Sequence, residues 1–217
     1  MSRTALAETR AWVDRAVIGL RLCPFARAPQ VKGRVRYALS EARDADALLG
    51  DLVVELGRLA EASPERIETT LLVHPHVLGR FADYHRFLAV ADEAIRALEL
   101  EGTIQIASFH PRYRFAGSAA GDISNATNRS PHPMLHLLRE ASIERALASF
   151  DEPESIYESN MRTMERLGRA GWVALQSACR DDALAAEPDH SNRSRLQADA
   201  ELATTRPTAL QKVDPKA

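Results

Sequence analysis

Two histidines stand at the same point of two similar segments, each directly before a proline. His74 follows the apolar run 69-TTLLV-73, and His110 follows the alternating run 104-IQIASF-109. Proline cannot donate to a strand ladder, so each His-Pro pair is expected to end a strand. If the two strands are parallel, both imidazoles lie at one rim of a sheet, where ligands of open α/β folds gather. We expect His110 to act as an acid–base group, with simple strand termination as the alternative.

The segment between residues 110 and 140 is long for a loop and rich in side chains that recognise anions. A helix starting near Pro131 would add free backbone N–H groups beside Arg129, which favours a phosphate or a carboxylate. A surface loop with ordinary capping residues explains the same composition. The residues that we expect to contact an anionic substrate are His74, Arg112, Asp122, Asn125, Asn128, Arg129, Ser130, Arg139 and Glu140.

A helix is predicted over residues 133–149, and it carries a second histidine. On a helix, His136, Arg139 and Glu140 share one polar side, because they are spaced by three and four residues. His136 is therefore a second acid–base candidate. Alternatively, His110, His136 and Glu140 form a two-histidine, one-carboxylate set for a divalent transition metal. The main expectation is a site without a metal, since the sequence requires no cofactor.

Cys23 lies in 22-LCPFA-26, which resembles thiol-redox motifs. In those motifs the cysteine opens a helix whose dipole lowers its pKa. Here it follows a helix predicted over residues 5–20, where the dipole opposes thiolate formation. The other cysteine, Cys179, is distant in sequence, which excludes a paired redox motif. A buried structural thiol is therefore expected, and the alternatives for Cys23 are a catalytic nucleophile or a further ligand of the metal.

The elements that position these residues alternate between helices and strands. This order favours an α/β or α+β domain, with a small parallel or mixed sheet of three to four strands flanked by helices. An additional antiparallel strand near 112–116 is compatible with it. Residues 1–178 are expected to form a single domain, and residues 179–217 a disordered tail without an apolar period. Apolar spacing predicts helices over 5–20, 48–59, 80–100, 133–149 and 153–167, and strands over 34–39, 69–75 and 103–109. The continuous apolar run in the strand 69–75 predicts that this strand is buried on both faces.

Composition limits the partners. The net charge of −2 over 217 residues argues against a general polyanion-binding surface, so no nucleic-acid partner is expected and any anion site must be local. No apolar run is long enough to span a membrane, and residues 1–20 lack the apolar core of a signal peptide. With two distant cysteines, these features indicate a cytoplasmic protein with reduced thiols. The sequence does not determine the oligomeric state.

Four segments carry a resemblance to a known family. They are 15-RAVIGLRLCPFA-26, 69-TTLLVHP-75, 105-QIASFHPRYRFAG-117 and 127-TNRSPHPMLHLLREASIERAL-147. In their order and length they resemble a bacterial family known as domain of unknown function 1415, from about residue 5 to about residue 175. The resemblance implies no known reaction, cofactor or catalytic residue.

Three functions are compatible with these features. The first is a small-molecule enzyme of transferase or hydrolase type, in which His110 and His136 move protons and the arginines hold an anionic substrate. The second is a metal-dependent enzyme that uses the histidine and glutamate set. The third is a non-catalytic protein that binds an anionic metabolite through the same loop.

Overall fold

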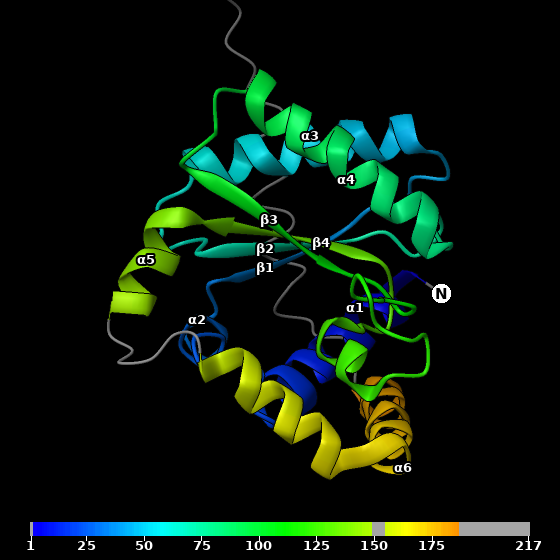
Figure 1. Cartoon of the computed structure of the whole chain (residues 1–217). Helices are drawn as coiled ribbons and strands as arrows, with labels where there is room; N and C mark the ends of the chain where they lie inside the picture. The colour runs from blue at the N-terminus through cyan, green and yellow to red at the C-terminus, as the bar shows by residue number, and fades with distance from the viewer. Residues whose placement is uncertain (1, 149–154, 187–217) are drawn as a thin grey trace, which may run out of the picture. The chain divides into compact units, whose positions relative to one another are not determined.

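The structure is a computed structural model that describes residues 2–148 and 155–186. Four strands form one mixed sheet in the order β1-β2-β4-β3 (Figure 1). β1 is parallel to β2, whereas β4 is antiparallel to both of its neighbours, β2 and β3. β2 and β3 are therefore parallel to each other, so the two His-Pro pairs lie at the same rim. The bounds are β1 Val35–Leu39, β2 Thr69–Val73, β3 Ile104–Phe109 and β4 Met134–Arg139.

The helix predicted over 133–149 is wrong in its first half. Residues Met134–Arg139 form β4, and the helix α5, Glu140–Ala148, begins only after it. The apolar residues of this segment fit both the helical period of 3.6 residues and a strand, because β4 lies between two strands and buries side chains on both faces. Alternate residues of a strand face opposite ways, so His136 and Arg139 do not share a side. The antiparallel strand is thus β4, and residues 112–116 form no strand.

The helices predicted over residues 5–20, 48–59 and 80–100 are confirmed. The first is an α-helix followed directly by one π-helical turn. A long final helix, α6, continues beyond residue 167 through a break at Gly168, whose φ is 62° and ψ 178°. Residues 179–185, expected in the tail, belong to α6, and residues 187–217 lie outside the described residues. The bounds are α1 Ser2–Trp12, η1 Val13–Ile18, α2 Arg27–Val31, α3 Ala45–Glu61, α4 Phe81–Ala97, the 3₁₀ helix η2 Ile123–Asn128 and α6 Ser155–Ala185.

The sheet has an apolar core on each face. α3 and α4 cover one face, and α1, η1 and α6 contribute to the core on the other (Figure 1). The five residues of β2 are all buried, which confirms the prediction drawn from their continuous apolar run. The described residues up to Leu184 form one compact unit. Among the described residues, no helix combines the length and apolarity needed to cross a membrane.

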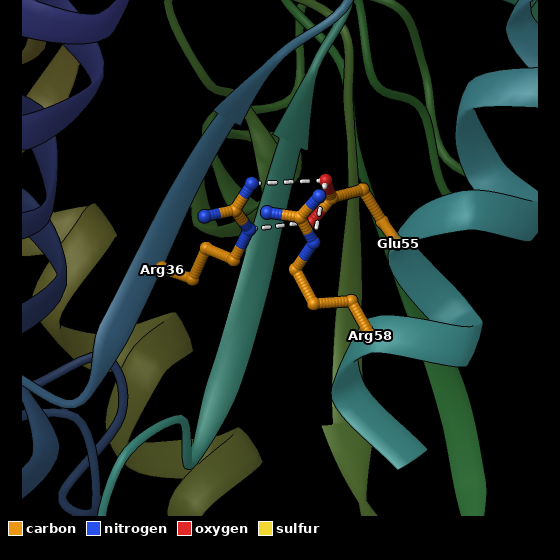
Figure 2. Close-up of polar contacts among 3 residues, drawn as sticks. All are labelled: Arg36, Glu55 and Arg58. Carbon is orange, nitrogen blue, oxygen red and sulfur yellow. Dashed lines mark hydrogen bonds and ion pairs between the residues drawn. The ribbon is translucent and has the colours of Figure 1, made fainter. Parts of the chain in front are cut away.

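One ion pair fixes β1 to α3. The guanidinium of Arg36 donates to both carboxylate oxygens of Glu55, from Nε at 2.6 Å and from Nη2 at 3.0 Å (Figure 2). Arg58, one turn along α3, places its Nε 3.7 Å from the same carboxylate. Glu55 is only 7% exposed, so its charge requires such partners. These contacts explain why a predominantly apolar layer tolerates Arg36 on β1.

Candidate functional site

The two rim histidines come together, but the protein encloses both. His74 and His110 are 0% and 1% exposed, and the ring of Tyr84 lies 5.8 Å and 5.1 Å from theirs. The Nδ1 of His110 accepts from the backbone N–H of Arg112 at 2.9 Å, so its Nε2–H donates to the carbonyl of Leu78 at 3.2 Å. Burial lowers the pKa of both imidazoles, that of His74 to about 4. Both ring nitrogens of His110 are thus occupied by backbone groups.

Most of the loop residues predicted to bind an anion form hydrogen bonds with backbone groups of other residues instead. Asn125 is fully buried; its Oδ1 accepts from the N–H of Phe115 at 2.9 Å, and its Nδ2 donates to the carbonyl of Ala119 at 2.9 Å. Three further residues do the same: Asp122 caps η2 by accepting from the N–H of Ser124, Asn128 donates to the carbonyl of Ser108, and Ser130 donates to that of His132. These contacts shape the loop and leave little capacity for a ligand.

Two of the predicted anion-binding residues, Arg129 and Ser130, border a small cavity near the rim. Arg129 is held by backbone carbonyls. Its Nε and Nη2 donate to the carbonyls of Tyr113 and Ala120, at 3.2 Å and 2.9 Å. The cavity has a volume of about 180 Å³ and is lined by Arg129, Ser130 and Arg180, among others. His110 does not line it. The predicted rim pocket is therefore small and lacks its proposed acid–base group.

A larger cavity, of about 760 Å³, lies on the sheet face opposite α3 and α4. We call it the sheet-face cavity. Strands β1 to β4 form its floor, and residues from α1, η1, α2 and α5 form its walls. Its lining is predominantly apolar and includes Trp12, Leu71 and Phe109. This size and composition are typical of sites for small organic ligands.

His136 lines this cavity and has one ring nitrogen without a hydrogen-bond partner among the described residues. Its Nε2 lies 2.7 Å from the Oγ1 of Thr69, which also lies 2.7 Å from the carbonyl oxygen of Leu137. A carbonyl only accepts, so the single hydroxyl proton goes to Leu137 and Thr69 accepts the Nε2–H of His136. Nδ1 therefore carries the lone pair, and it has no hydrogen-bond partner among the described residues. Burial lowers the pKa of this imidazole to about 4, which keeps it neutral at neutral pH.

Cys23 lines the same cavity, so two of the three predicted catalytic residues share one site. It does not close a helix as predicted, because η1 ends at Ile18 and α2 begins at Arg27. The thiol is half-buried, and burial raises its pKa against the opposing effect of neighbouring backbone amides. Cys23 is accordingly a protonated thiol rather than a ready nucleophile.

The sheet-face cavity is positively charged, although the chain as a whole is not. Four cationic residues and a single acidic residue, Glu68, line it, whereas the whole chain has a net charge of −2. Of the cations, Arg139 donates to the carbonyls of Leu59 at 2.5 Å, of Ala62 and of Ile67 at 3.2 Å, and so caps the end of α3. The others are Lys32, Arg34 and Arg145.

The predicted metal set does not assemble. Among the described residues, no group of three or more histidine, cysteine, aspartate or glutamate side chains is placed to hold a metal ion. His136 pairs with Ala107 in the middle of the sheet, whereas His110 lies three residues farther along, beyond the end of β3. That separation is about 10 Å along a strand. Glu140 was included in this set because a helix over residues 133–149 would have placed it beside His136. Residues 134–139 form β4 instead, and Glu140 is the first residue of α5.

Sequence reasoning missed the residues that complete the sheet-face cavity. Thr69 fixes the tautomer of His136, and Trp12 and Phe109 pack edge to face with their ring centroids 5.4 Å apart. The alternation of β3 could have placed Phe109 on the same face as Ala107, but no local pattern reveals that β4 lies between β2 and β3. The pairing of Thr69 with His136 depends entirely on that order.

Comparison with known proteins gives a family and no activity. No curated protein and no solved structure matches the chain significantly. A family model described as a protein of unknown function, DUF1415, matches residues 4–174, which is most of the chain. The chain therefore belongs to the DUF1415 family.

Proposed function

We propose that this protein is a small-molecule enzyme of hydrolase or transferase type that acts on an anionic substrate in the sheet-face cavity. The observation that carries the proposal is the state of His136. Its Nε2–H is held by Thr69, while its Nδ1 has no partner among the described residues and belongs to a residue that lines a predominantly apolar cavity. A neutral imidazole with one fixed tautomer is suited to accept a proton from a bound reactant.

The chemistry follows from this tautomer. In ester hydrolysis, Nδ1 of His136 takes a proton from water as the water oxygen bonds to the carbonyl carbon. It then returns the proton to the departing alkoxide as the carbon–oxygen bond breaks. In a transferase, an acceptor hydroxyl replaces the water. A pKa of about 4 makes the free imidazole a weak base, and an anion bound nearby raises that pKa.

A second function, ligand binding without turnover, is favoured by a separate observation. Burial raises the pKa of the Cys23 thiol and lowers that of the His136 imidazole, so both groups are uncharged at neutral pH. A cavity with two neutral polar groups and a cationic border can hold an anion without attacking it.

The two free cysteines also suit a reducing compartment, and we propose on this basis that the protein is cytoplasmic.

Ester hydrolysis by purified protein distinguishes the two functions. The substrates are p-nitrophenyl half-esters of dicarboxylic acids, which keep a free carboxylate, and the measurement is release of p-nitrophenol. We expect turnover that falls at least about a hundredfold in His136→Gln. The control, His85→Gln, makes the same change on the exposed side of α4 and should retain activity. Equal turnover in wild type and His136→Gln would refute the catalytic role, and binding without any turnover would favour the second function.

A further inference from the structure

The charges that border the sheet-face cavity lie at one end of it. Arg34 directly precedes β1, and Glu68 directly precedes β2. Arg145 lies on α5, the helix that begins where β4 ends. The register aligns these points, because the first residue of β1 pairs with the first residue of β2, which pairs with Leu138 near the end of β4. The charged residues thus flank the edge at which β1 and β2 begin.

The remainder of the cavity is predominantly apolar, although His136 and Cys23 also line it. Leu71 and Phe109 lie farther along the sheet, and Trp12, Val13 and Val17 line the wall from α1 and η1. Phe109 also contacts His136, with ring centroids 6.1 Å apart. A ligand that fills this space must therefore be charged at one end and hydrocarbon along the rest.

Two cations remain available for the charged end. Arg145 places its Nη2 3.7 Å from the carboxylate of Glu68, which partly neutralises both. Lys32 and Arg34 have no side-chain hydrogen bond or ion pair within 4 Å among the described residues, although the charge of Arg34 also acts on the carboxylate of exposed Glu65. Lys32 is exposed. The nearby carboxylate of Glu65 offsets part of these two positive charges, so the charge that remains fits a single negative charge better than a doubly charged phosphate.

His136 lies inward from this charged end. It shares a row across the sheet with Leu71 and Ala107, two residues along the strands from the row that contains Thr69. Two residues correspond to about 7 Å. Arg34 precedes the Thr69 row by one residue, at the start of β1, which β2 separates from β4. A chain whose anionic head lies beside the guanidinium of Arg34 must therefore run both along and across the sheet to reach His136.

We infer that the ligand of the sheet-face cavity is a linear amphipathic monocarboxylate. Its carboxylate lies by Lys32 and Arg34, and its hydrocarbon chain runs over the sheet past His136 toward Phe109. The inference rests on the proposed function for the identity of the site, and it specifies the substrate class: the reacting group sits on the chain, inward of the head. The volume of about 760 Å³ accommodates an extended chain of this kind.

Isothermal titration with soluble alkyl ligands tests this inference. The probes are hexanoate, octanoate and decanoate, with decanol and decyltrimethylammonium as uncharged and cationic analogues. We expect wild-type protein to bind decanoate at least about tenfold more tightly than decanol, and the cation least. Affinity for the carboxylates should rise roughly three- to fourfold with each added methylene, because each one leaves water for an apolar wall.

Substitution of the two cations tests whether they bind the carboxylate of decanoate. Lys32→Met and Arg34→Met, singly and together, should weaken decanoate binding toward that of decanol while leaving decanol unchanged. Arg80→Met removes an exposed cation at the start of α4, outside the cavity, and should have no effect. Equal affinity for decanoate and decanol, no gain with chain length, an unaltered double variant, or no binding at all would each overturn the inference.

The same titration with His136→Gln separates this inference from the proposed reaction. Decanoate should still bind within about threefold of wild type, because the carboxylate lies away from the imidazole. If binding persists and turnover is absent in wild type as well, the catalytic proposal fails and the ligand class stands. If wild-type protein shows the expected dependence on chain length but His136→Gln no longer binds decanoate, the carboxylate lies at His136. That result would contradict the inferred orientation.

Discussion

The Oγ1 of Thr69 on β2 lies 2.7 Å from Nε2 of His136 on β4, and the threonine proton is already committed to a backbone carbonyl. Two strands that are far apart in sequence thus set one imidazole tautomer. The nitrogen left free belongs to the side chain that lines the sheet-face cavity. Removing the hydroxyl should change the imidazole while leaving the cavity in place.

Thr69→Val is the direct test, because valine preserves the shape of threonine and removes the acceptor. The Nε2–H of His136 then loses its partner, and we expect a loss of about 1–2 kcal/mol in the free energy of unfolding. Nitrogen NMR of the imidazole should change from a single Nε2–H tautomer to a mixture. Thr69→Ser keeps the hydroxyl and should retain both properties. An unchanged tautomer in Thr69→Val would show that another contact fixes the ring.

His110 should behave as a structural residue. His110→Ala removes the acceptor for the N–H of Arg112 and the donor to the carbonyl of Leu78 from a buried position. We expect it to cost about 2–4 kcal/mol of unfolding free energy. His110→Asn should cost less, because its side-chain oxygen can still accept from the amide two residues on. Full stability combined with lost turnover in His110→Ala would restore the catalytic role predicted from sequence.

The sequence predicted the strands that end in His-Pro because proline chemistry acts locally. It also predicted that β2 is buried on both faces, because a continuous apolar run has few other solutions. The sequence-based prediction failed at residues 134–139. Six residues are too few to distinguish a helical repeat from a strand when the strand is covered on both faces. That one element decides whether His136 meets Glu140 or Thr69. The rim site expected from the sequence and the sheet-face cavity therefore lie in different parts of the sheet.

Burial of His74 predicts a particular dependence of stability on pH. Its pKa falls from 6.5 to about 4 in the folded protein. Between these values the unfolded chain binds a proton that the folded chain does not, so stability is complete above pH 6.5 and is lost as the pH falls toward 4. The loss due to His74 is about 3 kcal/mol.

Urea unfolding across that pH range measures this loss. His74→Phe keeps a ring beside Tyr84 and removes the titrating group, so its stability should depend less steeply on pH than that of wild type. The matched His85→Gln variant, at an exposed position, should follow wild type. Parallel pH profiles for wild type and His74→Phe would show that other groups govern the acid sensitivity.

Arg139 should contribute to stability rather than to ligand binding. Its guanidinium bonds three carbonyls at and beyond the end of α3, a geometry that requires a planar fork. We expect Arg139→Met to lower the free energy of unfolding by about 2–4 kcal/mol, because the carbonyls lose their donors. Arg139→Lys should recover only part of it. Decanoate affinity should remain unchanged in the folded Lys variant, and a selective loss of that affinity would return Arg139 to the ligand site.

Gly168 breaks α6 in a conformation that only glycine adopts readily, with φ 62° and ψ 178°. A Cβ added there would contact nothing within 4 Å, so a substitution is penalised by the backbone and not by crowding. We expect Gly168→Ala to cost about 1–3 kcal/mol of unfolding free energy, measured in urea.

Gly50→Ala is the matched control, because Gly50 lies inside α3 and a Cβ added there also meets nothing within 4 Å. Since alanine favours a helix, this control should gain about 0.5–1 kcal/mol. A gain in both variants would mean that α6 can run straight through residue 168, and that the kink is not required to place Trp172 and Cys179 in the core.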